Sequence, residues 1–394
     1  MNIMFIIPSL SGGGAERVIT VLASELSKKH KVTVVTYYKS DKPYVIDKSV
    51  DVKCLNTSGG SNPIQKSLNS RKRIHMLKKL KKELAIDCSI SFLYAPNYEN
   101  VKSKQGEKTI VSLRSKYSVN YKGIKGKINS YTCKKADLSV ALSKSVMYDQ
   151  IVNFDTPENK IIAIYNPCDI EQINRMAGEP VPDPLFESIR KKFDSIVINA
   201  GRLTDQKGQW HLIRSFKEII KKHPSTALVI LGEGGLKPYL EELIKGSGLS
   251  ENVFLLGFYN NPYPFLKQSD IFAVTSLHEG FGNILLEAMA CGLPVVSCDC
   301  DAGPRELMAP QSDLHCFADK VQLEEYGILT KVMDGKKYTA DDPLSEEEKM
   351  FAEGINKMLD DEKLLKHYKL SSQTRIKDFS KEKIVKEWEK VLKT

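Results

Sequence analysis

Short apolar runs alternate with longer stretches of helical periodicity along most of the chain. The runs of the first half are Ile3–Ile7, Lys31–Tyr37, Cys88–Leu93, Thr109–Leu113, Leu138–Leu142 and Ile161–Tyr165. Those of the second half are Ser195–Ala200, Ala227–Leu231, Val253–Leu256, Ile271–Thr275, Pro294–Ser297 and Tyr326–Thr330. Continuous runs rich in Val and Ile, separated by helices, are typical of parallel sheets covered on both faces. The pattern predicts an α/β protein with two doubly wound domains.

A proline-rich stretch separates the two series of runs. Residues 166–193 carry four prolines and no strong apolar run, which favours a linker. We therefore expect an N-terminal domain over residues 1–185 and a C-terminal domain over residues 186–377. The final segment, residues 378–394, contains a predicted amphipathic helix that places Ile384, Trp388 and Val391 on one face.

The first apolar run, Asn2–Leu10, is too short to cross a membrane, because a spanning helix needs roughly 20 apolar residues. It has neither the basic start nor the cleavage site of a secretion signal, so we expect a buried strand. The eight cysteines form no CxxC pair, a pattern typical of reduced thiols in a cytosolic enzyme. These features favour a cytoplasmic location.

The net charge of +9 is unevenly distributed. Residues 1–180 hold 29 Lys and Arg against 16 Asp and Glu, whereas residues 181–394 hold 29 against 33. A basic half suggests an anionic partner, such as a membrane, a nucleic acid or an acidic glycan. Nucleic-acid binding has only the charge in its favour, since no aromatic-rich strand pair or helix-turn-helix pattern accompanies it.

The basic charge is densest over Lys66–Lys82, which contains no acidic residue. Its apolar residues recur at helical spacing: Ile74, Leu77, Leu80 and Leu84. A basic amphipathic helix can lie on an anionic membrane surface, which would make the protein peripheral on the inner face of the membrane. The alternative is a solvated helix that packs on its own sheet.

Three glycine-containing loops follow predicted strands. The first, Ser11–Arg17, brings Gly13 and Gly14 to the start of a helix, where backbone amides favour an anion. It is not GxGxxG and no acidic residue ends the second strand, which argues against a dinucleotide site. The second carries Arg202 and Lys207, two cations that suit a diphosphate, and the third carries Gly234. Each loop alone is equally compatible with a tight turn or a solvated loop.

The segment Ser276–Ala290 carries the most specific pattern. Glu279 precedes a Gly-Phe-Gly-Asn turn, and Glu287 follows eight residues later, about two helical turns on. If a helix starts near Asn283, its free amides face the group that Glu279 faces. Carboxylates accept hydrogen bonds from vicinal diols, and a nucleotide sugar has one diol on the ribose and one on the hexose.

These residues resemble retaining glycosyltransferases of family 4, which have the GT-B fold of two Rossmann-like domains facing across a cleft. The resemblance rests on Glu279-x7-Glu287, on the upstream Gly-Arg and Lys-Gly pairs, and on the N-terminal Gly-Gly-Ala-Glu-Arg. It implies that Arg202 and Lys207 hold the donor diphosphate, that Glu279 binds the transferred sugar, and that Glu287 binds the ribose. It also implies that Gly13 and Gly14 line the cleft, that the final helix returns to the first domain, and that the phosphate is faced by Gly282, Asn283 and Ile284.

The chain departs from the family pattern at Arg114, where many members carry a histidine that faces the donor sugar. We assign Arg114 to the acceptor side. The Asp299-Cys300-Asp301 triplet spells the DxD pattern of metal-dependent enzymes, but in a GT-B context we expect no metal and no cofactor. For Arg305 and Glu306, a structural turn with an ion pair and a substrate contact both stay open.

Together with these residues, the resemblance implies a metal-independent, retaining glycosyltransferase that moves a hexose or N-acetylhexosamine to a hydroxyl group. UDP is the expected nucleotide, with GDP open, and the expected acceptor is a bacterial surface glycan or a lipid-linked saccharide. The alternatives are a non-catalytic nucleotide-sugar-binding subunit and another GT-B enzyme, such as a nucleotide-sugar epimerase. The complete set of donor residues argues against both.

Overall fold

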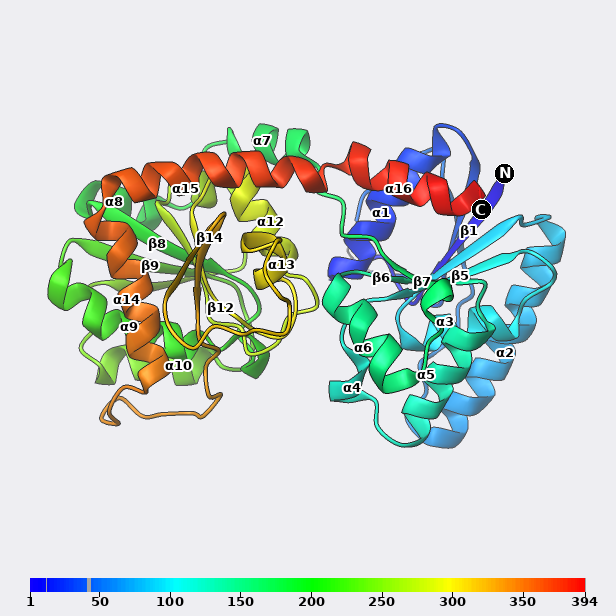
Figure 1. Ribbon diagram of the computed structural model, residues 1–394. Coiled ribbons are helices and arrows are strands. Elements are labelled where there is room, and N and C mark those ends of the chain that lie inside the picture. Colours follow the sequence, from blue (N-terminus) through cyan, green and yellow to red (C-terminus); the bar gives the residue numbers. More distant parts are fainter. Residues whose placement is uncertain (12, 41–43, 394) are drawn as a thin grey trace. The chain divides into compact units, whose positions relative to one another are not determined.

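The computed structural model describes residues 1–11, 13–40 and 44–393, which form two compact units (Figure 1). The N-terminal unit comprises residues 1–167 together with residues 381–394, and the C-terminal unit comprises residues 168–380. The division at 167/168 precedes the expected one at 185/186, because the expected linker is largely helical. Helix α7 (Ile170–Ala177) packs on α11 and α12 of the C-terminal unit, so these residues belong to that unit.

The N-terminal unit is a seven-stranded parallel sheet in the order β3-β2-β1-β4-β5-β6-β7. Its strands are β1 (Asn2–Ile7), β2 (Lys31–Thr36), β3 (Asp51–Cys54), β4 (Cys88–Phe92), β5 (Lys108–Leu113), β6 (Leu138–Ala141) and β7 (Ile161–Ala163). Its helices are α1 (Gly14–Ser27), α2 (Pro63–Glu83), α3 (Tyr94–Lys102), α4 (Tyr117–Asn120), α5 (Ile124–Lys135), α6 (Lys144–Phe154) and α16 (Lys381–Lys393), with a short 3-10 turn η1 (Glu158–Lys160).

Alternation along β1 explains why helices cover both faces of this sheet. Phe5 and its neighbours two residues away belong to a core shared with α1 and α16, whereas Met4 and Ile6 pack with Leu77 of α2. Helix α16 buries Trp388 against Phe92 with a ring separation of 6.2 Å, and it lies beside α1 (Figure 1). The amphipathic helix predicted at the end of the chain is confirmed, and it belongs to the N-terminal unit.

The C-terminal unit repeats this design with the strand order β10-β9-β8-β11-β12-β14-β13, parallel except for the antiparallel pair β13 and β14. Its strands are β8 (Ser195–Ala200), β9 (Thr226–Leu231), β10 (Val253–Gly257), β11 (Ile271–Val274), β12 (Val295–Cys298), β13 (Gln322–Glu324) and β14 (Gly327–Thr330). Its helices, besides α7, are α8 (Pro184–Lys192), α9 (Gln209–Lys222), α10 (Lys237–Gly246), α11 (Tyr263–Lys267), α12 (Asn283–Ala290), α13 (Pro304–Met308), α14 (Glu346–Asp360) and α15 (Glu362–Arg375), with the 3-10 turns η2 (Asp205–Lys207) and η3 (Ile376–Phe379).

Each sheet reverses its strand order once, between β1 and β4 in the N-terminal unit and between β8 and β11 in the C-terminal unit. Open parallel sheets bind ligands beyond the carboxyl ends of the strands at such a reversal. The loops after β1, β8 and β11 carry the glycines and charges singled out in the sequence. No helix in the described ranges is both long enough and apolar enough to cross a membrane.

Candidate functional site

The loops that follow β8 and β11 meet where the C-terminal sheet reverses. The backbone amide of Leu277 donates to the carbonyl oxygen of Gln206 at 2.8 Å, and the side chain of Gln206 donates to the carbonyl oxygen of His278 at 2.9 Å. These bonds fix the loop that carries Lys207 against the loop that carries Glu279. The fold thus brings two predicted site residues together although 72 positions separate them in the chain.

Lys207 and Glu279 form an ion pair at this junction. The Nζ atom of Lys207 lies 2.5 Å from Oε1 of Glu279, and the hydroxyl of Ser276 donates to the same oxygen at 2.7 Å. The Lys207 side chain is 17% exposed and that of Glu279 is 7% exposed, so solvent screens the pair only weakly. A cation and a hydrogen-bond acceptor are therefore adjacent at the carboxyl edge of the sheet.

The glycine loop after β9 packs closely against the loop after β8. A Cβ atom at Gly234 would lie 2.3 Å from the carbonyl oxygen of Leu203, so a glycine is required there for the two backbones to approach. Gly234 thus shapes the loop that presents Arg202, whose side chain is exposed. The structure therefore places Arg202 at the carboxyl edge of the C-terminal sheet, with its side chain open to solvent.

Helix α12 begins at Asn283, with Gly282 as its N-cap in the left-handed region at a φ of 84°. Its positive end, at Asn283 and Ile284, follows directly on the Glu279 loop, and such helix starts favour anions. Glu287 lies further along the same helix and is 8% exposed. The helix start and the two glutamates predicted from spacing therefore belong to one strand–loop–helix unit.

The two aspartates of the DxD-like triplet already have partners. Oδ2 of Asp299 accepts hydrogen bonds from the Arg305 guanidinium, at 2.8 Å from its Nε, and from the Ala318 amide at 2.8 Å. Oδ2 of Asp301 lies 3.5 Å from Nδ1 of His278. No group of three or more His, Cys, Asp or Glu side chains within residues 1–11, 13–40 and 44–393 is arranged to hold a metal ion.

Arg305 makes the ion pair that one of the two interpretations of this segment expected. Beyond Asp299, it donates to Gln322 at 2.8 Å and to Ser312 at 3.1 Å, tying the segment between α13 and β13 to the end of β12. Glu306, beside it on α13, is buried.

In the N-terminal unit, the start of α1 is covered by a side chain of the same helix. Gly13 is the N-cap, and a Cβ atom there would lie 2.2 Å from Oε2 of Glu16, so the Glu16 carboxylate folds over the position. Burial raises the pKa of Glu16. Gly14, the first helical residue, is exposed, and Gly12 lies outside the described residues. The Glu16 carboxylate therefore occupies the end of α1 that was expected to bind an anion.

Arg114 follows β5 at the carboxyl edge of the same sheet. Its Nη2 donates to Oδ1 of Asn166, its Nη1 lies 3.4 Å from the Ser112 hydroxyl, and its guanidinium lies 5.2 Å from the Phe92 ring centroid. Asn166 is buried and 52 positions away in the chain, and nothing in the sequence indicated that it would lie there. No local pattern in the sequence signals that contact.

An aromatic cluster that was not expected from the sequence also lies in this unit. The rings of Tyr94 and Tyr121 stack with centroids 4.5 Å apart, and Tyr117 meets Tyr121 edge-on at 4.7 Å. Leu93, the residue before Tyr94, has a φ of 77°, which a non-glycine residue rarely adopts. The three tyrosines are spread over 28 residues with no regular spacing, which explains why the sequence did not reveal them.

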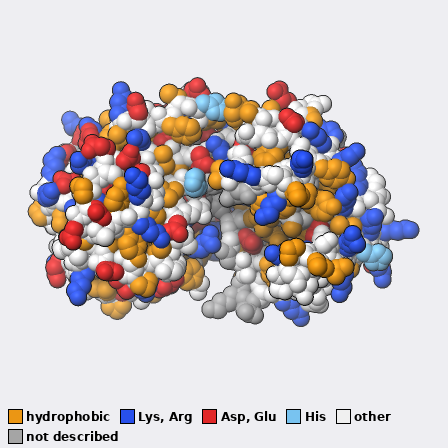
Figure 2. All heavy atoms as spheres, turned by 90° about the horizontal axis from the view of Figure 1, so that it is seen from below, with side chains coloured by type: hydrophobic (Ala, Val, Ile, Leu, Met, Phe, Trp, Pro, Cys, Tyr) orange, Lys and Arg blue, Asp and Glu red, His pale blue; other side chains and the backbone are white. Residues whose placement is uncertain are grey.

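Helix α2, which carries the Lys66–Lys82 segment, turns two of its basic side chains inward. Arg73 and Lys81 are buried in ion pairs with Glu99 and Glu107, each at 2.7 Å, so neither faces solvent. Leu77 packs into the core, and the remaining cations of the helix are exposed: Lys66, Arg71, Lys72, Lys78, Lys79 and Lys82. Figure 2 shows Lys and Arg side chains gathered over the N-terminal unit, on its right-hand side.

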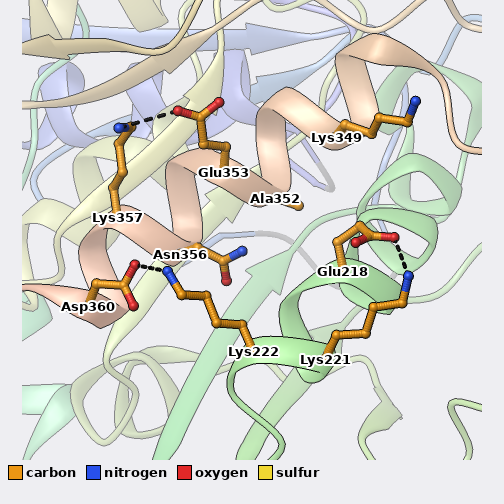
Figure 3. Close-up of a pocket in the computed structure, with 9 residues that line it drawn as sticks. All are labelled: Glu218, Lys221, Lys222, Lys349, Ala352, Glu353, Asn356, Lys357 and Asp360. Carbon is orange, nitrogen blue, oxygen red and sulfur yellow. Dashed lines mark hydrogen bonds and ion pairs between the residues drawn. The ribbon is translucent and has the colours of Figure 1, made fainter.

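A surface cavity of about 670 Å³ lies elsewhere, between α9 and α14 (Figure 3). It contains no predicted site residue, and its lysines pair with neighbouring acids, as Lys221 does with Glu218 at 2.6 Å and Lys357 with Glu353 at 3.3 Å. Lysines that are neutralised in this way leave little net charge for an anionic ligand. We therefore keep the candidate site at the sheet edges.

Comparisons with known proteins agree with the geometry. A family model described as Glycosyltransferase Family 4 matches residues 12–172, and one described as Glycosyl transferases group 1 matches residues 183–327. The chain is 41% identical over 261 residues to an uncharacterized glycosyltransferase of Methanocaldococcus jannaschii, which covers 66% of this chain and 64% of the relative.

A second relative covers nearly the whole chain. The N-acetylgalactosamine-N,N'-diacetylbacillosaminyl-diphospho-undecaprenol 4-alpha-N-acetylgalactosaminyltransferase of Campylobacter jejuni is 35% identical over 389 residues, 96% of each chain. The crystal structure of HepE from Anabaena in complex with UDP matches with a TM-score of 0.76 at 20% identity, covering 100% of both chains. This likeness confirms the predicted GT-B fold. The chain is an enzyme of glycosyltransferase family 4.

Proposed function

We propose that the enzyme transfers a hexose or N-acetylhexosamine from a UDP-sugar to a hydroxyl group of a glycan acceptor, with retention of anomeric configuration and without a metal ion. The observation that carries the proposal is the Lys207–Glu279 pair at the sheet reversal, directly before the start of α12. A cation, a helix start and two carboxylates at one edge match the diphosphate and the two diols of a nucleotide sugar.

Relatives support the substrate classes. HepE of Anabaena was crystallised with UDP and with UDP-glucose, which favours UDP as the nucleotide. The Campylobacter jejuni relative transfers N-acetylgalactosamine to a saccharide on diphospho-undecaprenol. We therefore propose a lipid-linked saccharide as the acceptor and N-acetylhexosamine as the first sugar to test, in the assembly of a bacterial surface glycan.

The chemistry requires no side-chain nucleophile. As the bond between the anomeric carbon and the donor phosphate oxygen breaks, the acceptor oxygen bonds to that carbon on the same face, and its proton passes to the departing phosphate oxygen. Lys207 and Arg202 stabilise the charge that develops on the diphosphate. Glu279 is held by Lys207 and Ser276, so its carboxylate is placed to accept bonds from sugar hydroxyls rather than to attack carbon.

The exposed cations of α2 extend the proposal to location. Six basic side chains on one helix would attract an anionic lipid surface and hold the enzyme on the cytoplasmic leaflet beside a lipid-linked acceptor. Since Leu77 is buried in the core, the attraction is electrostatic and does not involve insertion of that face of the helix.

The test is transfer from a panel of UDP- and GDP-sugars to a saccharide on polyprenyl diphosphate, with NMR of the fresh product. We expect turnover with a UDP-sugar, and we expect the new glycosidic bond to have the same anomeric configuration as the sugar in the donor. Lys222→Ala, a change of an exposed lysine on α9, serves as a control of unchanged activity. Inversion, or a stable hexosyl adduct on Glu279 in intact-mass spectra, contradicts the proposed mechanism.

A further inference from the structure

Arg114 is a half-buried cation that no carboxylate pairs with in the part of the chain that the structure describes. Its guanidinium donates to Asn166 and, at 3.4 Å, to Ser112, and both partners are neutral. A guanidinium has five N–H donors, so most of its hydrogen-bonding capacity remains for a ligand.

The other deeply placed arginines behave differently. Four arginines that are buried more completely than Arg114 each contact a carboxylate: Arg73 with Glu99, Arg214 with Glu348, Arg305 with Asp299, and Arg375 with Asp378. This is expected, because a cation taken out of water without an anionic partner is costly. Arg114, which is half-buried, has no carboxylate partner among the described residues and lies at a sheet edge of the kind where ligands bind.

Arg114 is positively charged at neutral pH, and little negative charge surrounds it. Among acidic residues, Glu16 exerts an electrostatic effect on it, and the Glu16 carboxylate folds back over Gly13. Burial lowers the pKa of Arg114 to about 10, so the group is still protonated at neutral pH. Residues 108–136 contain no Asp or Glu, and Lys116 and Lys122 add to the positive charge.

We propose that Arg114 binds a phosphate group of a substrate at the carboxyl edge of the N-terminal sheet, with Asn166 orienting the guanidinium. The planar guanidinium matches two phosphate oxygens and binds them in a bidentate manner. This inference rests on the proposed function, in which the donor and a lipid-linked acceptor each carry a diphosphate. The expectation from the sequence placed Arg114 on the acceptor side without naming a ligand group, and the inference names that group as a phosphate.

Binding is measured by calorimetry on the full chain, with inorganic pyrophosphate as the probe and UDP present at saturation, and separately with UDP alone. Arg114→Gln should weaken binding of one of these ligands roughly tenfold to a hundredfold, and Arg114→Lys less. Glu16→Gln removes a negative charge that acts on Arg114 and should strengthen the same binding about threefold. Lys48→Gln, which removes an exposed charge of the same unit, should match the wild type.

The two measurements identify the source of the phosphate. A weaker UDP affinity in Arg114→Gln assigns the donor diphosphate. An unchanged UDP affinity, weaker pyrophosphate binding and a lost preference for a diphosphate-linked acceptor over the same saccharide on a neutral aglycone assign the acceptor. Neither binding measurement needs turnover, so a failure of the proposed transferase reaction leaves this test intact.

Unchanged affinities for both ligands in a folded Arg114→Gln variant overturn the inference. Folding is checked by comparing its Tm with that of the wild type. If Arg114→Gln does not fold, Arg114→Lys and Glu16→Gln decide, and wild-type affinities in both overturn it as well.

Discussion

The Nζ atom of Lys207 lies 2.5 Å from Oε1 of Glu279, so the two charged groups predicted to hold the donor are bound to each other. The carboxylate also accepts a hydrogen bond from Ser276. A lysine in this position has to exchange or share its carboxylate when a diphosphate binds. The pair therefore fixes the position of Lys207 and at the same time lowers its affinity for phosphate.

Replacing Lys207 by alanine should lower kcat roughly 10²–10³-fold and change the KM for the donor much less. The reason is that the diphosphate gains charge as the sugar leaves, so Lys207 contributes most in the transition state. Steady-state kinetics against donor concentration provide the measurement. A variant with wild-type kcat and a raised KM would instead make Lys207 a ground-state binding residue.

Glu279→Gln should bind UDP more tightly, by about tenfold or 1.4 kcal/mol, because it releases Lys207 and removes a negative charge near the phosphate. The same variant should transfer sugar more slowly, since the amide accepts hydroxyl bonds less strongly than a carboxylate. Calorimetry with UDP and kinetics with the UDP-sugar separate the two effects. Weaker UDP binding in the variant would argue against competition within the pair.

Asp299→Asn should destabilise the C-terminal unit by about 3 kcal/mol, because it leaves the buried Arg305 without an anionic partner. Urea denaturation followed by tryptophan fluorescence measures the change. Asp205→Asn, which alters an exposed ion pair of the same unit, should cost less than about 1 kcal/mol. Adding Arg305→Met to Asp299→Asn should recover much of the loss, and no recovery would mean that Asp299 stabilises by another route.

Turnover in EDTA should equal turnover with magnesium or manganese. In the proposed mechanism Arg202 and Lys207 supply the positive charge that a metal would provide, while Asp299 is engaged by Arg305 and Ala318. Initial rates after exhaustive chelation test this. Loss of activity that manganese restores would return Asp299 and Asp301 to the donor site.

Changing four exposed lysines of α2 to glutamine should weaken binding to anionic vesicles by about 1 kcal/mol for each charge removed. The changes are Lys72→Gln, Lys78→Gln, Lys79→Gln and Lys82→Gln, and activity on a soluble acceptor should stay at the wild-type level. Vesicle sedimentation is the measurement. A control with the same charge change in the C-terminal unit should bind normally: Lys245→Gln, Lys267→Gln, Lys320→Gln and Lys357→Gln.

Equal release by both quadruple variants would assign vesicle binding to net charge and not to α2. Arg73 and Lys81 are excluded from the test because each is buried against a glutamate, so their loss would report stability and not lipid binding.

The buried strands were predictable from the sequence because a strand covered on both faces leaves a continuous apolar run. Strands β3 and β13 were not, since both lie at sheet edges where side chains remain exposed and polar. The boundary between the units was expected too far along the chain, at 185/186 instead of 167/168. Prolines suggested a linker, whereas Pro184 occupies the first turn of α8, where proline is favourable.

For the candidate site, the spacing of Glu279 and Glu287 and the position of Lys207 after a strand indicated which residues lie near one another, and their roles in binding the donor stay predictions. The sequence could not show that Lys207 pairs with Glu279, or that Asn166 orients Arg114, because contacts between distant positions leave no local pattern. The same reason applies to α2, which is a helix as its periodicity predicted. Arg73 and Lys81 point inward and pair with glutamates from other segments, which the sequence could not show.

Helix α16 has a consequence for the order in which the protein can be made. Trp388 stacks on Phe92, and the Lys108 side chain donates to the carbonyl oxygen of Val391, so the core of the first unit is completed by residues that are synthesised after the whole second unit. At about 5–20 residues per second, translation of the C-terminal unit takes on the order of ten to forty seconds. During that time the Phe92 side chain lacks the Trp388 contact that buries it in the finished protein, so a chaperone can bind the exposed apolar surface. All residues of the second unit are made before α16, so the second unit can fold before the first is complete.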